Sequence, residues 1–327
     1  MSEVKKFALG VDVGGTNSKF GLVDAEGVLH YSNSIKTNTA STPTRLVHAI
    51  YDEIKQNTDF IDDICGVGIG APNGNYFSGS IEFAPNLDWK GIVPLASLFE
   101  KCFGVKAVLT NDANAAAVGE QIYGIAHDLT NFVTITLGTG LGSGVIADNT
   151  LIYGHNGMAG EYGHIRVIPE GRDCGCGRKG CLETYASATG VVRSIELLET
   201  EYKASSKIHA IENPHAEDVF ELARQGDIFC SEIIDYTAEI LGNSLADFAC
   251  FSNPQAYVLF GGIAQSGDDF AQKVKGFMEV GILNIYKGKI EIRISSLHDR
   301  NAAVLGAASL VRKELELLKL HYSLLLH

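Results

Sequence analysis

Apolar residues follow two periodicities in the first third of the chain, and their order predicts a mixed α/β protein. Runs with an apolar residue at every second position, broken by glycine, are typical of strands joined by tight turns. Apolar residues spaced three and four apart are typical of helices that bury one face. The expected strands are 7–15, 19–24, 28–35, 64–70 and 106–111, and the expected helices are 43–58, 94–103 and one that begins at Asp112.

The segment 131–154 repeats the pattern that opens the chain. At an offset of 124 residues, Gly14 aligns with Gly138, Leu22 with Ile146 and Asp24 with Asp148, although the identity between the two blocks is thin. The rest of this half predicts helices near 183–202, 216–225, 228–250 and 268–280, with strands at 256–262 and 291–295. Each half is therefore expected to begin with a β-meander and continue with helices and strands.

A chain of 327 residues is long for one core and suits two domains. We expect residues 1–125 and a C-terminal helix at 302–327 to form a smaller first lobe, and residues 126–301 to form a larger second lobe. An active site is expected in the cleft between the two lobes.

The charge balance of the chain excludes some classes of partner. Lys and Arg total 26 against 39 Asp and Glu, which gives a net charge of −13. The electric field of this negative charge repels nucleic acids and anionic membranes. The N-terminus has no apolar run of signal-peptide length, so a cytoplasmic protein is expected. Seven cysteines, four of them isolated, do not resemble the disulfide framework of a secreted protein.

Two glycine turns directly follow apolar strands, at 12–19 (DVGGTNSK) and 137–144 (LGTGLGSG). Glycine lets backbone N–H groups approach an anion closely, and threonine adds a hydroxyl donor. Either turn alone is equally well explained as a tight hairpin, whereas matching turns in a repeat favour phosphate binding. The candidate phosphate-binding residues are Gly14, Gly15, Thr16, Asn17, Lys19, Gly138, Thr139 and Gly140. Asp12 is placed to hold Mg²⁺ beside the phosphates, and a third turn at Gly261 and Gly262 is suited to a flat base.

The segment 110–117 (TNDANAAA) ends a strand and starts a helix, with Asp112 at the junction. Asp112 is a candidate helix N-cap. It is also a candidate general base that accepts a hydroxyl proton during phosphoryl transfer. Asn86 and Asn111 are short amides of the kind that orient a polyol, although Asn86 is equally suited to a turn.

Three cysteines lie within eight residues, at Cys174, Cys176 and Cys181, and His164 is ten residues upstream. A disulfide between Cys174 and Cys176 would be strained, because one residue separates them. Three cysteines and one histidine are the ligands of a closed structural zinc site; unmetallated thiols are the alternative. Such a site would join the loop with Glu161 and His164 to Glu183, forming a wall of acceptors for sugar hydroxyls. The alternative for both glutamates is an ordinary surface position.

These motifs together resemble the ROK family, which comprises repressors and sugar kinases with the actin-like ATPase (ribonuclease H-like) fold. The most specific match is the combination GEYGHIRV and CGCGRKGCLE, and the resemblance covers nearly the whole chain. The chain departs from the family pattern at Asn73 and Ile263, where glycine is common. Past the signature, LETYASATGVVR resembles the family's bacterial glucokinases.

The resemblance implies Asp112 as catalytic base, ATP and Mg²⁺ as cosubstrate and cofactor, a structural Zn²⁺, and a homodimer. It implies hexose contacts at Asn86, Asn111, Asp112, Glu161, His164 and Glu183, and zinc ligands at His164, Cys174, Cys176 and Cys181. The expected reaction is phosphorylation of a hexose at its 6-hydroxyl, with glucose ahead of N-acetylglucosamine, N-acetylmannosamine or fructose. The alternative is a sugar-sensing regulator. Regulators of this family carry an N-terminal helix-turn-helix domain, whereas here a strand is expected from about Lys6.

Overall fold

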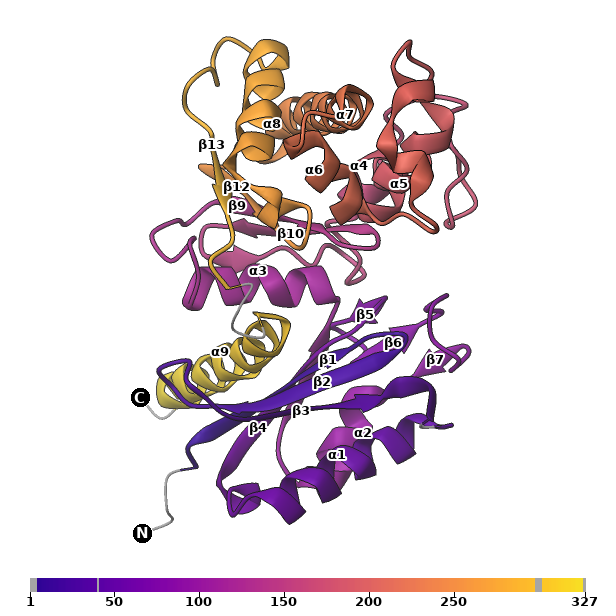
Figure 1. The fold of residues 1–327 in the computed structure, drawn as a ribbon. Helices are drawn as coiled ribbons and strands as arrows, with labels where there is room; N and C mark the ends of the chain where they lie inside the picture. The colour runs from indigo at the N-terminus through magenta and orange to yellow at the C-terminus, as the bar shows by residue number, and fades with distance from the viewer. Residues whose placement is uncertain (1–4, 40, 298–301, 326–327) are drawn as a thin grey trace. The chain divides into compact units, whose positions relative to one another are not determined.

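The computed structural model describes residues 5–39, 41–297 and 302–325, which form two compact units (Figure 1). Within the described residues, the first unit comprises the chain up to His127, the segment Tyr153–Ala159 and the residues from Leu297 onward. The second unit comprises Asp128–Ile152 and Gly160–Ser296. Tyr153–Ala159 thus belongs to the first unit, although the residues on both sides of it belong to the second.

The first unit is built on a five-stranded sheet in the order β3-β2-β1-β4-β8. Its strands are β1 (Phe7–Val13), β2 (Asn17–Val23), β3 (Leu29–Lys36), β4 (Ile64–Gly70) and β8 (Ala107–Thr110). The first three form an antiparallel meander, while β4 and β8 run parallel to β1. The carboxyl ends of β1, β4 and β8 therefore meet at one edge of this sheet.

Helices cover both faces of the first sheet (Figure 1). Helices α1 (Pro43–Asn57) and α2 (Leu95–Phe103) pack together, and α9 (Ala302–Leu325) packs on β1, β4 and α3 (Asp112–Ile122). Glycines in the strands permit the close approach of α9. A Cβ at Gly10 would overlap the carbonyl oxygen of Val304, and one at Gly68 would overlap that of Ala307.

The sheet of the second unit has the order β11-β10-β9-β12-β13, which repeats the topology of the first. Its strands are β9 (Phe132–Leu137), β10 (Leu141–Ala147), β11 (Thr150–Leu151), β12 (Ala256–Phe260) and β13 (Glu291–Ile294). Again a meander is followed by two strands parallel to its first strand. The predicted repeat is confirmed as a repeat of topology.

The helices of the second unit are α4 (Glu183–Ala186), α5 (Ala188–Leu197), α6 (Ala216–Arg224), α7 (Ile228–Ser252) and α8 (Asp268–Gly281). The prediction of one helix over 183–202 is wrong. The backbone is extended at Ser187, which accepts a hydrogen bond from Gly190 N and so caps α5, and this helix ends at Leu197. A serine can continue a helix or cap one, and the apolar pattern does not distinguish the two.

The sequence pattern did not predict the short strands and 3-10 helices. A three-stranded sheet of β5 (Gly74–Asn75), β6 (Ser80–Glu82) and β7 (Ile92–Val93) lies in the first unit. Strands of two or three residues are too short to display alternation. The 3-10 helices are η1 (Thr37–Thr39), η2 (Ile61–Asp63), η3 (Tyr162–His164), η4 (Lys203–Ser205), η5 (Lys207–Ala210) and η6 (Ala264–Ser266). Among the described residues, no helix combines the length and the apolar character needed to cross a membrane.

The packing of α9 against the first sheet generates a stability prediction. Replacing Gly68 with Ala places a methyl group on the backbone of Ala307, so we expect a loss of about 2–3 kcal/mol in the free energy of unfolding. Gly276→Ala is the control, because Gly276 is exposed within α8 with open space around its Cβ position. The control should be more stable by about 0.5–1 kcal/mol. Denaturant unfolding measures both; equal effects would contradict the proposed close packing.

Candidate active site and metal centre

Two carboxyl groups lie at the carboxyl edge of the first sheet. Asp12 on β1 pairs with Gly70 on β4, and Gly70 pairs with Thr110 at the end of β8. Asp112 follows two residues later, and its Cα would lie 3.6 Å from a Cβ placed on Gly70. Parallel pairing therefore brings together two acidic residues that are 100 positions apart in the sequence.

The start of α3 differs from the prediction by one residue. Asn111 is the N-cap, and its Oδ1 accepts hydrogen bonds from Ala113 N at 2.8 Å and Asn114 N at 3.2 Å. Asp112 is the first residue of the helix, so the prediction of Asp112 as N-cap is wrong. Asn and Asp are equally good caps, and only the exact end of β8 decides between them. The Oδ1 of Asp112 accepts one bond from Ala113 N at 2.9 Å.

Both carboxyls have raised pKa values. Burial, with a further contribution from the nearby Asp112, raises the pKa of Asp12 to about 6, and the Lys19 ammonium only partly opposes this. Surrounding protein also raises the pKa of Asp112, against the effect of the bond from Ala113, even though the residue retains solvent-exposed surface. A carboxylate with a raised pKa accepts a proton more readily than an ordinary aspartate, as a general base requires. The Lys19 ammonium compensates the Asp12 carboxylate only in part, so a bound cation would stabilise the ionised form of Asp12.

The first glycine turn lies against the segment that carries Asn86. Gly14 N donates to Asn17 O at 3.1 Å, which closes the turn. A Cβ on Gly15 would be 2.5 Å from the carbonyl oxygen of Asn86, so only glycine allows this contact. Asn86 itself is exposed, while Leu87 after it is buried and anchors the segment.

Asn73, one of the two departures from the family pattern, has a backbone conformation that glycine adopts readily. Asn73 has φ of 49°, a left-handed conformation that asparagine tolerates better than most residues. Its Nδ2 donates to Glu82 O at 3.0 Å, and Glu82 N donates back to Asn73 O at 3.0 Å. Asn73 thus adds a hydrogen bond that a glycine would not make.

The second glycine turn, in the second unit, contacts Glu183. Gly138 N donates to Gly140 O at 3.0 Å. A Cβ on Gly140 would overlap Oε2 of Glu183, and the same oxygen accepts a bond from Leu141 N at 3.2 Å. The position of Glu183 is therefore set by the turn predicted to bind phosphate.

The third glycine turn lies beside the second one. Gly261 follows β12, which runs parallel to β9, and has φ of 105°. A Cβ on Gly261 would be 2.6 Å from Leu137 O, at the start of the second turn. Ile263 is buried in the core of the second unit, whereas Gly262 before it is exposed.

The three clustered cysteines and His164 converge as predicted, with their candidate ligand atoms all within 4.8 Å of one another. The Sγ atoms of Cys176 and Cys181 are 3.7 Å apart, and Cys174 Sγ is 3.7 Å from His164 Nδ1. Tetrahedral zinc with ordinary bond lengths would place two sulfurs about 3.8 Å apart and a sulfur and a nitrogen about 3.6 Å apart. The two distances are close to these values, so the four residues are compatible with a tetrahedral ion.

The three thiols differ in how readily they ionise. Burial opposes ionisation of Cys176, but hydrogen bonds from the backbone and side chain of Arg178 and from the other two thiols lower its pKa to about 6. Burial raises the pKa values of Cys174 and Cys181. A divalent cation would stabilise all three as thiolates.

His164 is directed both to the cysteines and to Glu161. Its Nδ1 faces Cys174, and its Nε2 lies 4.0 Å from Oε2 of Glu161. A metal on Nδ1 would leave Nε2–H as a donor beside that carboxylate. The candidate sugar-binding residues thus fall into two sets: Asn86, Asn111 and Asp112 in the first unit, and Glu161, His164 and Glu183 in the second.

Sequence reasoning missed Arg172, which holds the cysteine loop on α4 and α5. Its guanidinium donates to Thr184 O at 2.8 Å, Gly190 O at 3.0 Å and Ser194 Oγ at 2.8 Å. It also lies 4.5 Å from the ring centroid of Tyr185. These contacts join residues 12 to 22 positions apart, and no local motif signals them.

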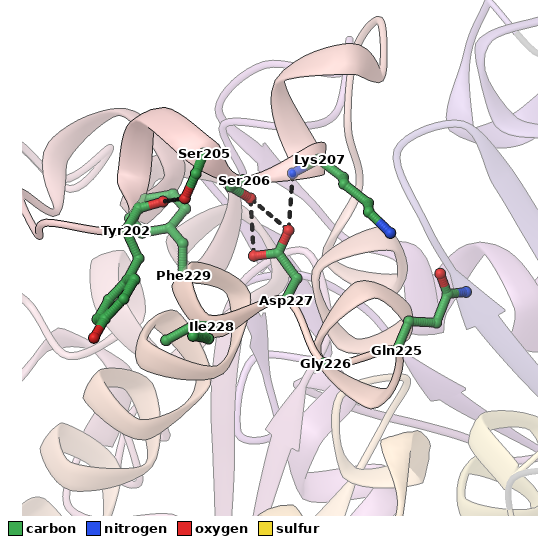
Figure 2. A pocket seen from close by; sticks show the side chains of 9 residues that line it. All are labelled: Tyr202, Ser205, Ser206, Lys207, Gln225, Gly226, Asp227, Ile228 and Phe229. Carbon is green, nitrogen blue, oxygen red and sulfur yellow. Dashed lines mark hydrogen bonds between the residues drawn. The ribbon is translucent and has the colours of Figure 1, made fainter.

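A pocket of about 200 Å³ elsewhere in the second unit shares no residue with these sets (Figure 2). Figure 2 shows the Asp227 carboxylate bonded to Ser206 Oγ and Lys207 N, at 2.9 and 2.8 Å. Asp227 also caps α7. These bonds occupy the carboxylate in joining two segments of the chain, which is a structural role.

Known proteins resemble the chain over nearly its whole length. It is 36% identical over 319 residues to a glucokinase from Halalkalibacterium halodurans, covering 94% of this chain and 96% of the relative. It is 30% identical over 308 residues to the xylose repressor of Bacillus subtilis, covering 93% of this chain and 77% of the repressor. A crystal structure of a ROK family glucokinase from Streptomyces griseus, in complex with glucose and AMPPNP, superposes with a TM-score of 0.78 at 33% identity, covering 94% of this chain and 99% of that one.

The superposition confirms the predicted α/β class and actin-like ATPase fold. The family model for ROK matches residues 8–314, which span both units. On the matched residues and the relatives together, the chain belongs to the ROK family.

Proposed function

We propose that this protein is an ATP-dependent hexose kinase that phosphorylates glucose at its 6-hydroxyl. The observation that carries the proposal is the position of Asp112 at the sheet edge that also carries Asp12 and the first glycine turn. The glucokinases among the relatives support the same substrate and reaction. N-acetylglucosamine, N-acetylmannosamine or fructose as the favoured hexose is the alternative within the same chemistry.

In the proposed reaction, Asp112 acts as general base. Its carboxylate accepts the proton of the sugar 6-hydroxyl as that oxygen forms a bond to the γ-phosphorus of ATP. The bond from the γ-phosphorus to the bridging oxygen breaks, and ADP leaves with the electron pair. The proton remains on the Asp112 carboxyl until solvent removes it, for which a raised pKa is suited.

The glycine turns are proposed to hold the nucleotide. Backbone N–H groups of the turns beginning at Gly14 and Gly138 would donate to phosphate oxygens, and the turn at Gly261 would leave room for adenosine. Asp12 would hold Mg²⁺, directly or through water, and the ion supplies neutralisation of phosphate charge. The raised pKa of Asp12 supports this role, because a nearby cation would remove the cost of ionising that carboxyl.

The hexose is proposed to be bound by the candidate sugar-binding side chains. Glu183 and Glu161 accept bonds from hydroxyl groups, and His164 Nε2 donates. Asn86 is exposed and offers both a donor and an acceptor, whereas the Oδ1 of Asn111 serves the cap of α3 and leaves its NH₂ group to donate. Bonds to several hydroxyls at once would orient the 6-hydroxyl toward the base.

Zinc on His164, Cys174, Cys176 and Cys181 is proposed to be structural. Four protein ligands leave no open position for chemistry. The ion would fix the imidazole of His164 and join its loop to the segment that carries Glu183. The cysteines would then contribute to sugar binding without taking part in the reaction.

A sugar-sensing regulator is the second candidate, since a xylose repressor is among the relatives. A sensor needs the sugar-binding wall but has no use for a base or for two phosphate turns. The presence of Asp112, Asp12 and both turns favours the kinase.

Asp112→Asn tests the base. It should lower kcat by at least roughly 10²-fold while glucose binding largely persists, because an amide cannot accept the proton at this step. Steady-state assays and calorimetry measure the two effects. Asp62→Asn is the control, because Asp62 is an exposed carboxyl in η2, before the opposite end of β4. Near-normal turnover of Asp112→Asn would remove Asp112 from the base role.

The same assignment predicts the pH dependence of the wild-type enzyme. The base must be ionised to work, so kcat should fall as the pH drops through its pKa. Because that pKa is raised, the fall should begin at a higher pH than for an ordinary aspartate, whose pKa is about 3.9. A profile that is flat down to the ordinary aspartate range, with the protein still folded, would contradict this.

Cys176→Ser tests the metal centre. The purified wild-type protein should contain about one zinc per chain, and the variant should lose most of it and bind glucose more weakly. Cys250→Ser is the matched control, because Cys250 is also exposed but lies in α7. Elemental analysis and calorimetry measure the outcome. A zinc-free wild-type protein with full affinity for glucose would refute the centre.

A sugar panel tests the substrate. Glucose should be phosphorylated with a higher kcat/KM than N-acetylglucosamine, N-acetylmannosamine or fructose, in a coupled assay run with ATP and with polyphosphate. Preference for another hexose would correct the substrate but keep the chemistry. Binding of xylose without phosphorylation of any sugar would favour the regulator.

A further inference from the structure

Ser143 is buried in β10 and bonds to the backbone on both sides of Glu161. Its hydroxyl donates to the carbonyl of Gly160 and accepts a bond from Tyr162 N at 3.2 Å. Tyr162 N also donates to Gly160 O at 2.9 Å. The Ser143 hydroxyl, the Gly160 carbonyl and the Tyr162 N–H are therefore all hydrogen-bonded to one another, on the two sides of Glu161. The hydroxyl of one serine thus fixes the backbone that carries a candidate sugar ligand.

The chain needs such a fixed point here, because the segment before Glu161 is rich in glycine. Gly154, Gly157 and Gly160 all have φ in the left-handed region, at 73°, 86° and 91°. Glycine has more conformational freedom than any other residue. Gly160 is also the first residue of the second unit after Tyr153–Ala159. The bonds from Ser143 therefore attach the chain at the point where it re-enters this unit.

The strand that provides this attachment also holds the other glutamate. Leu141 N, two residues before Ser143, donates to Oε2 of Glu183 at 3.2 Å. On the other side of Glu161, Gly163 packs so closely on Leu141 O that a Cβ would overlap it. The first three residues of β10 thus set the positions of both glutamates relative to the second glycine turn.

We propose that Ser143 is a positioning residue for the hexose, which places Glu161 at a fixed distance from Glu183 and from the second phosphate turn. This inference rests on the proposed function, in which Glu161 binds the sugar. Ser143 does not contact substrate. It acts by removing the backbone freedom that the preceding glycines would otherwise give to Glu161.

Ser143→Ala tests the proposal through sugar affinity. Without the hydroxyl, Glu161 should adopt a wider range of positions, so the Kd for glucose without nucleotide should rise roughly 5- to 50-fold. The KM for ATP should stay within about twofold, because the backbone of the glycine turn is unchanged. Hydrogen exchange of the Tyr162 amide should become faster. Calorimetry, steady-state kinetics and exchange mass spectrometry measure the three quantities.

Two further variants separate positioning from general stability. Ser143→Thr keeps the hydroxyl and should retain most of the affinity for glucose. Ser244→Ala removes another buried hydroxyl of the same unit, one that donates to Ile240 O within α7, and should leave the Kd for glucose unchanged. An unchanged Kd for a folded Ser143→Ala, or an equal loss in Ser244→Ala, would overturn the proposal.

Amide exchange in the wild-type protein tests the role of Ser143 even if the alanine variant fails to fold or the protein is not a kinase. In the wild-type protein, the Tyr162 amide should exchange much more slowly than an unprotected amide, and glucose should slow it further. Exchange at the unprotected rate would overturn the role of Ser143. A wild-type protein that protects this amide but neither binds nor phosphorylates any hexose would refute the proposed function instead.

Discussion

Parallel pairing of β1, β4 and β8 is the constraint on which the candidate site depends. Because these strands end at one edge of the sheet, Asp12 and Asp112 are forced into the same neighbourhood, where burial and their mutual repulsion raise the pKa of Asp12 to about 6. Such an arrangement is destabilising in isolation, and it is tolerated because the hydrophobic core of the first unit holds the strands in place. The second sheet repeats the topology, so its carboxyl edge carries two glycine turns, after β9 and β12.

Close contacts of glycine backbone connect these edges to the residues proposed to bind sugar. Gly15 lies against the carbonyl of Asn86, and Gly140 lies against the carboxylate of Glu183. In each unit a glycine turn suited to phosphate is thus in contact with a candidate sugar ligand. A side chain at either glycine would disturb both the proposed phosphate contact and the proposed sugar contact, so each short turn affects two parts of the site.

The sequence pattern predicted the long helices and strands well, but not the residues at which helices begin and end. The strands β1, β4 and β12 and the helices α1 and α7 were evident because burial imposes a clear period on them. Ser187 interrupts a predicted helix, and Asn111 is the N-cap in place of Asp112. Several neighbouring residues have side chains that can cap a helix, and tertiary packing selects one of them.

Long-range contacts were harder still. The convergence of the three cysteines and His164 could be predicted, since cysteine and histidine spacing is a chemical signature. Arg172 and Ser143 could not, because their bonds join distant segments. The chain divides its proposed chemistry unequally: the base belongs to the first unit, whereas the metal centre, Glu161 and Glu183 belong to the second. In the proposed mechanism, loss of the carboxyl at Asp112 alone would slow phosphoryl transfer and leave the proposed sugar-binding residues of the second unit intact. Glucokinases and a xylose repressor both resemble this chain over nearly its whole length, so the proposed base and the two glycine turns, rather than the fold, favour the kinase.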